Sequence, residues 1–161
     1  MELWEHPSET LPRCLFFSAG RLARILGKMA EEAFEPSGLP PSYAFALLVI
    51  AERRDITQNE LATTLSLSPS TLTRFLDKLE EKGLVERHPS GKTTRLTVTP
   101  TGQSLRSVLG RCWKTLQGRY QTVLGPREGR TAAGKLENLA TLLEPEKLRK
   151  SSPQASVSMM V

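Results

Sequence analysis

TQNELATTLSLSPSTLTRFLDKLEEKGLVERHPSGKTTRLTVTPTG, residues 57–102, is the stretch that decides the fold of this chain. It begins with the pattern of a capping box. The Thr57 hydroxyl accepts a hydrogen bond from a free N–H of the first helical turn, and Glu60 reaches back to the N–H of Thr57. The apolar residues that follow are spaced for one buried face of a short helix: Leu61, Ala62 and Leu65.

A second helix follows after the two-residue turn Ser66-Leu67. Ser68 is a good N-cap, and Pro69 stands at the first helical position, where its missing N–H does no harm. Gly83 ends this helix after Lys82. Apolar side chains repeat at intervals of three and four and predict its buried face: Leu72, Phe75, Leu76 and Leu79.

Two short strands come next, Leu84–His88 and Arg95–Thr99, the second with apolar and polar residues in alternation. Residues 89–92 form the connecting loop, and a long helix starts at Pro100. Helix, turn, helix, hairpin and helix in this order predict a winged helix-turn-helix within a mainly α (α+β) fold. Further helices are expected over 11–35 and 43–52, and after a polar loop at 126–130.

Composition and charge exclude several classes of function. The net charge of +5 favours an anionic partner only weakly, and no segment is a basic tail. The two cysteines form no Cys-x-x-Cys pair, and no apolar run is long enough to cross a membrane. With only His6 and His88, and no phosphate-binding glycine loop, the sequence predicts no enzyme, metal site or cofactor. A reducing cytoplasm is the expected compartment.

The exposed face of the second helix carries residue types that suit DNA reading. A recognition helix enters the major groove with small polar and long basic residues on its N-terminal half. We expect base contacts from Ser70, Thr71, Thr73 and Arg74. We expect contacts to the DNA backbone or the minor groove from Ser68 and Lys78, and from Arg87, Lys92 and Arg95 of the hairpin.

The stretch from Glu60 to Arg87, followed by Leu96-Thr97-Val98-Thr99 and Gly102, resembles the MarR family of bacterial transcription regulators. The resemblance is most specific at Ser70-Thr71-Leu72-Thr73-Arg74 and at Lys82-Gly83-Leu84-Val85. It implies a homodimer in which two winged motifs bind palindromic double-stranded DNA. It also implies a small phenolic or lipophilic effector that releases the DNA, and it favours a repressor.

Domain boundaries follow from the pattern and from this resemblance. We expect a flexible lead-in over 1–10, one domain over 11–150, and a disordered tail over 151–161. Within the domain, residues 11–40 and 100–150 are the expected dimerisation helices, and 41–99 the DNA-binding part.

The wing departs from the family pattern. MarR proteins usually carry an Asp-x-Arg pair in the wing, and the matching places hold Ser90 and Lys92 in a loop that looks shorter. A lysine lacks the planar fork with which arginine binds a phosphate. We therefore expect a different or weaker contact at the tip of the wing.

Two alternatives remain open. Cys14 lies early in the first helix, as in peroxide-sensing members of the family, and Cys112 of a partner subunit is a candidate resolving thiol. The tyrosine of those sensors is replaced by Ser18, and most free cysteines are small buried hydrophobes. The second alternative is a winged-helix module that binds protein without binding DNA.

Overall fold

The computed structural model describes residues 7–144. The chain forms two compact units, residues 1–117 and 118–161, and the boundary between them falls inside helix α6. The expected single domain over 11–150 stays a prediction. The expected tail over 151–161 lies outside the described residues, as do the first six residues of the expected lead-in.

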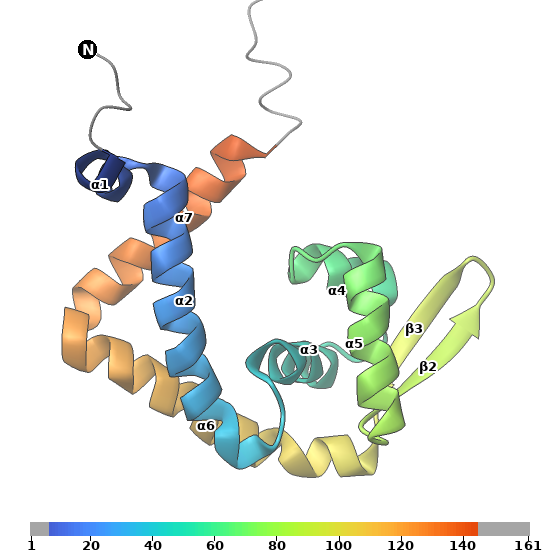
Figure 1. Ribbon diagram of the computed structural model, residues 1–161. Helices are drawn as coiled ribbons and strands as arrows, with labels where there is room; N and C mark the ends of the chain where they lie inside the picture. The colour runs from blue at the N-terminus through green and yellow to red at the C-terminus, as the bar shows by residue number, and fades with distance from the viewer. Residues whose placement is uncertain (1–6, 145–161) are drawn as a thin grey trace, which may run out of the picture. The chain divides into compact units, whose positions relative to one another are not determined.

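Figure 1 shows the elements, which follow the order expected for a winged helix-turn-helix. The described residues are mainly helical, with one small antiparallel sheet. In the first unit the elements are α1 (Pro7–Thr10), η1 (Leu11–Arg13), α2 (Leu15–Phe34), η2 (Glu35–Ser37), α3 (Pro41–Glu52), β1 (Ile56–Thr57), α4 (Gln58–Thr64), α5 (Pro69–Glu81), β2 (Val85–Ser90), β3 (Thr93–Val98) and most of α6 (Pro100–Leu124). The single helical turn α1 differs from the irregular lead-in that was expected.

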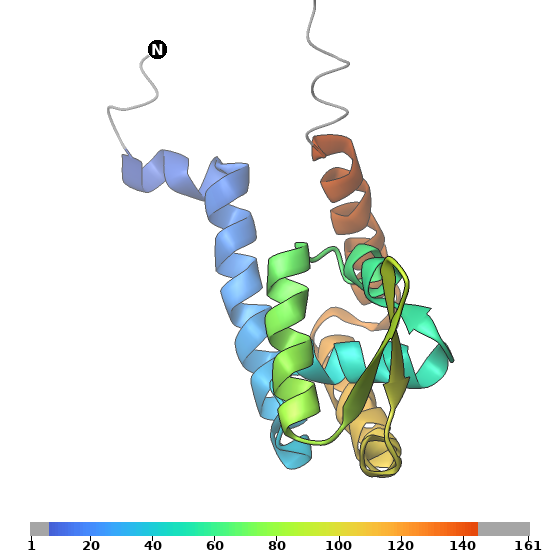
Figure 2. The ribbon, with the colours of Figure 1, turned by 90° about the vertical axis from the view of Figure 1, so that its right-hand side faces the viewer.

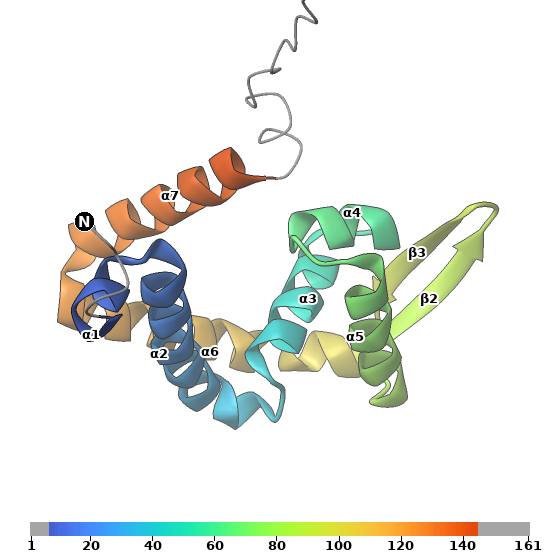
Figure 3. The same cartoon turned by 45° about the horizontal axis from the view of Figure 1, so that its top comes forward.

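Local signals place the two helices of the motif. The Thr57 Oγ1 accepts from the Glu60 N–H at 3.2 Å, and Glu60 Oε2 accepts from the Thr57 N–H at 2.8 Å, which confirms the capping box. Ser68 caps α5, and Gly83, with φ of +66°, follows its end. Figure 3 shows α4 leading through its turn to the start of α5, with the hairpin beyond α5.

The sheet has three strands in the order β1-β3-β2, one more than the sequence predicted. The additional strand β1 pairs antiparallel with β3, with Ile56 opposite Leu96 and Thr57 opposite Arg95. The pairing joins the residues just before α4 to the wing, and so it fixes the root of the hairpin against the helix-turn-helix.

The hairpin turn is tighter than the expected loop over 89–92. Ser90 pairs with Thr93, so only Gly91 and Lys92 connect the strands, and Gly91 has φ of +60°. A glycine with positive φ at the first of two central positions is typical of tight hairpin turns. Pro89 lies within β2. Proline has no backbone N–H to donate, and an edge strand such as β2 tolerates this. Figure 2 shows the narrow hairpin beside α5.

The core of the first unit lies among α3, α4, α5, the sheet and α6. Apolar side chains from each of these elements are almost completely buried, including Leu47, Ile50, Leu61, Leu72, Leu76, Leu79, Leu96 and Leu109. Aromatic rings extend this core: Tyr43 stacks on Phe75 at 4.4 Å between centroids, and Phe45 meets Phe34 and Trp113 edge to face. The core therefore holds the apolar face of α5 and leaves its polar faces outside.

The second unit contains the end of α6 and helix α7 (Pro126–Leu143). The expected polar loop over 126–130 is wrong, because Pro126 is already the first residue of α7. Proline favours this position in helices, and Gly125 with φ of +81° makes the turn before it. Across residues 7–144, none of the helices has the length and apolar character that crossing a membrane requires.

Candidate nucleic-acid interface

The start of α5 carries a cluster of hydroxyl groups. Ser68 Oγ accepts from the Thr71 N–H at 3.3 Å and lies 3.1 Å from Ser70 Oγ and 2.8 Å from Thr71 Oγ1. Ser68 and Ser70 are exposed, and Thr71 is half-buried. The cap thus occupies the hydroxyls of Ser68 and Thr71 in part, while the Ser70 side chain faces solvent.

Basic side chains on α5 lie one turn apart. Arg74 and Lys78 are both exposed and share a face with Ser70. Lys78 Nζ lies 2.7 Å from Glu81 Oε2, a hydrogen bond that raises the pKa of Lys78 and lowers that of Glu81. Arg74 makes no ion pair within residues 7–144 and is free to meet a ligand.

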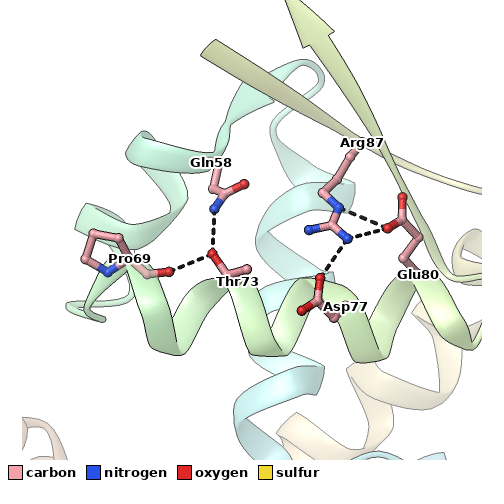
Figure 4. Close-up of polar contacts among 6 residues, drawn as sticks. All are labelled: Gln58, Pro69, Thr73, Asp77, Glu80 and Arg87. Carbon is pink, nitrogen blue, oxygen red and sulfur yellow. Dashed lines mark hydrogen bonds and ion pairs between the residues drawn. The ribbon is translucent and has the colours of Figure 1, made fainter. Parts of the chain in front are cut away.

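Thr73 lies on another face of α5 and its hydroxyl is already occupied. It donates to the carbonyl of Pro69 at 2.9 Å and accepts from Gln58 Nε2 at 3.1 Å (Figure 4). Gln58 is the first residue of α4, so this contact ties the two helices of the motif together. The sequence predicts Thr73 to be a base-reading residue, and no sequence signal points to Gln58.

Arg87 of β2 reaches α5, and its side chain is partly buried there. Its Nη2 donates to Asp77 Oδ1 at 2.7 Å, and its Nε donates to Glu80 Oε2 at 3.0 Å (Figure 4). These hydrogen bonds lower the pKa of Glu80 and raise that of Arg87. Arg87, which the sequence predicts to bind a phosphate, is therefore already bonded to two carboxylates of α5.

The other basic residues of the hairpin differ in whether their side chains are bonded to a partner. Arg95 Nη1 lies 2.8 Å from Asp55 Oδ2 and 3.2 Å from the Asp55 carbonyl. His88 Nε2 lies 2.8 Å from Thr97 Oγ1. Lys92 stands exposed in the two-residue turn and forms no ion pair in the part of the chain that the structure describes. Of the predicted wing contacts, Lys92 is thus the one whose charge is not shared with a carboxylate.

The two cysteines have different surroundings. Cys14 is exposed at the N-cap of α2, whereas Cys112 is 3% exposed within α6. The Ser18 hydroxyl donates to the Pro12 carbonyl at 2.8 Å and is not available to hold a thiolate. Within residues 7–144, no cluster of three potential metal-ligating side chains is present.

Comparison with known proteins identifies the family. A model of the MarR family matches residues 37–96. The transcriptional repressor MdtR of Bacillus subtilis is 30% identical over 120 residues, which cover 71% of this chain and 76% of MdtR. The chain belongs to the MarR family of transcriptional regulators.

Solved structures of MarR regulators share its architecture. MosR of M. tuberculosis, in complex with DNA, has a TM-score of 0.68 and 27% identity, over 81% of this chain and 98% of MosR. CouR bound to p-coumaroyl-CoA has a TM-score of 0.74, over 81% of this chain and 94% of CouR. At 23% identity it supports the MarR fold alone.

Some relatives of this MarR protein match over less of their length. The chain covers 55% of the regulator YwoH of Bacillus subtilis, at 35% identity over 75 residues. It covers only 22% of a riboflavin kinase of Thermococcus kodakarensis, at 45% identity over 47 residues. The relatives that match most of the chain are transcriptional regulators, whereas the kinase match is confined to a short segment.

Proposed function

We propose that this MarR protein is a cytoplasmic, homodimeric repressor that binds a palindromic operator and releases it when a small molecule binds. The observation that carries the proposal is the exposed face of α5. Ser70 and Arg74 are exposed on it, Arg74 forms no ion pair within residues 7–144, and Lys92 stands at the tip of the wing. An arginine that pairs with guanine contributes about 1–3 kcal/mol of discrimination against other bases.

Dimerisation is supported by large apolar side chains that are solvent-exposed in the single chain. In α2, Leu15 is 55% exposed and Phe16 is 88% exposed. In α7, exposed leucines recur on one side of the helix: Leu136, Leu139, Leu142 and Leu143. Exposed apolar residues that cluster on one helix are typical of an interface. Sedimentation should give twice the mass of the chain, and Phe16→Glu should lower it.

The DNA-binding proposal is tested with duplexes selected from a random pool and with the region upstream of the protein's own gene. We expect an inverted repeat with half-sites about 10 bp apart, and an affinity that falls steeply as salt rises. If no duplex binds even at low salt, the protein-interaction module becomes the better reading. The sign of regulation is tested by deleting the gene, which should raise transcription from the operator.

Effector release has support from a cleft in the first unit. About 740 Å³ in volume, it lies where the end of α3, strand β3 and the start of α6 meet. This volume is within the range of small-molecule sites. CouR binds p-coumaroyl-CoA, which shows that a repressor of this fold accommodates an aromatic acyl ligand. Phenolic and lipophilic compounds should therefore be screened for release of the operator.

Redox control through Cys14 is the second candidate, favoured by the exposure of that thiol at the start of α2. Cys112 is a poor resolving thiol, because its own chain already buries it. Mass spectrometry after peroxide treatment tests this route. Sulfenic acid or a disulfide at Cys14, with loss of DNA binding, would support it, and an unmodified Cys14 would exclude it.

A further inference from the structure

Polar residues on one stripe of α5 are all held by neighbouring elements. Thr73, Asp77 and Glu80 are spaced at i, i+4 and i+7, so they lie along one side of the helix. Gln58 of α4 holds Thr73, and Arg87 of β2 holds the two carboxylates (Figure 4). This stripe separates the buried apolar face from the exposed face that carries Arg74.

The Arg87 guanidinium has the geometry of a clamp. Its side chain is only 24% exposed, and it bonds through two different nitrogens to residues one helical turn apart. A planar guanidinium with donors in a fixed fork defines orientation better than a flexible ammonium does. Because Arg87 belongs to the hairpin, the clamp fixes α5 relative to the wing.

The contacts of Arg87 also compensate negative charge on α5. Asp77 and Glu80 are carboxylates on the recognition helix, close to the face that approaches a polyanion. Without Arg87 they would carry two uncompensated negative charges beside Arg74 and Lys78. Like charges brought together at an interface cost affinity, so the ion pairs remove a repulsion that the helix would otherwise present to phosphates.

We infer that Arg87 is a positioning residue, which acts on DNA reading through Asp77 and Glu80 and does not itself contact DNA. The inference rests on the proposed DNA-binding function. It reassigns a basic residue of the wing from phosphate contact to orientation and neutralisation of the recognition helix. Gln58 bonds to Thr73 of the same stripe, nearer the start of α5, and also helps to orient the helix.

The test is a cycle of variants measured by operator affinity. Arg87→Met should weaken binding by about tenfold, because it leaves both carboxylates unpaired. Adding Asp77→Asn and Glu80→Gln to Arg87→Met should recover most of that loss. A direct phosphate contact predicts the opposite: the triple variant would bind no better than Arg87→Met, and the two carboxylate changes alone would strengthen binding by freeing the arginine.

Lys92→Ala is the matched control. Like Arg87→Met, it removes one positive charge from the hairpin, but Lys92 has no carboxylate partner in the described residues. Its loss of affinity should persist when Asp77→Asn and Glu80→Gln are added. Circular dichroism confirms that each variant is folded. If the wild-type protein binds and the triple variant is not rescued, the inference alone is overturned. If the wild-type protein binds no DNA, the proposed function and the inference fall together.

Discussion

Gly102 of α6 lies directly against the backbone carbonyl of Leu84. A Cβ at this position would stand 2.2 Å from the Leu84 oxygen and 2.7 Å from Val98 Cγ2. No ordinary contact is that close, and a backbone carbonyl in a strand connection has little freedom to move. The contact explains why the long helix can begin so near the hairpin, and it makes Gly102 a sensitive position.

Gly102→Ala should destabilise the protein by about 1–3 kcal/mol, the range for forcing extra atoms into a packed site. Gly110→Ala is the control in the same helix, because its Cβ would meet nothing within 4 Å in the chain. That change should be neutral or stabilising, since alanine favours helix. Urea unfolding of both variants measures the difference, and equal midpoints would contradict the packing argument.

Stability should decline in acid because three carboxyls have lowered pKa values: Glu81, which accepts from Lys78, and also Glu60 and Glu80. Arg87 donates to Glu80, and Thr57 donates to Glu60 through its side chain and backbone, so each pKa lies below its ordinary value of 4.5. A carboxyl of this kind stabilises the fold above its unfolded pKa and loses that contribution as the pH falls through its folded pKa. The loss is therefore expected below about pH 4.5.

Glu80→Gln should flatten this acid dependence, because it removes one of the titrating groups. Unfolding midpoints measured from about pH 6 to pH 3 give the slope. Glu137→Gln in α7 removes a carboxylate that forms no ion pair in the described residues and should leave the slope nearly unchanged. A wild-type slope that persists in Glu80→Gln would show that the Arg87 contact contributes little.

Lys92→Ala should weaken operator binding and reduce the salt dependence. Each phosphate contact adds about 0.9 to the slope of log affinity against log salt, so the slope should fall by roughly one unit. Lys135→Ala removes the same charge from α7 and serves as control. An unchanged slope in Lys92→Ala would mean that the tight turn does not reach a phosphate.

The features that the sequence predicts correctly are those determined by residues close together in the chain. The capping box at Thr57, the start of α5 at Ser68 and its end before Gly83 all arise within a few residues, and each is confirmed. Strand β1 was missed because its two residues gain their pairing from β3, about 40 residues later. The predicted hairpin loop over 89–92 is too long because proline is typical of loops, and the sequence alone does not show that β2 is an edge strand.

The same limit applies to the candidate site. Arg87 lies ten residues from Asp77 and seven from Glu80, and only the folding of β2 against α5 brings the charges together. Sequence spacing gives the polar face of a helix, but it does not tell which of its residues a neighbouring element will occupy. Base reading by Ser70, Thr71, Thr73 and Arg74 stays a prediction.

Thr73 and Gln58 offer a direct test of whether an occupied hydroxyl reads bases. If the Thr73 hydroxyl serves to hold α4 on α5, Thr73→Val and Gln58→Ala should each weaken binding to a similar extent, and the double variant should lose little more. A hydroxyl that reads a base predicts additive losses and relaxed specificity in Thr73→Val alone. Affinities for the operator and its single-site variants separate the two results.

Arg74 should carry more of the base discrimination than any other residue of α5, because it is exposed, unpaired within residues 7–144 and able to donate two parallel hydrogen bonds. Arg74→Ala should cost about 1–3 kcal/mol of operator binding and relax the preference at one base pair of each half-site. Arg74→Lys keeps the charge but loses the fork, so it should retain nonspecific affinity while losing that preference. Binding to a set of operators changed at single positions measures both quantities. Uniform weakening across all of them would instead assign Arg74 to a phosphate.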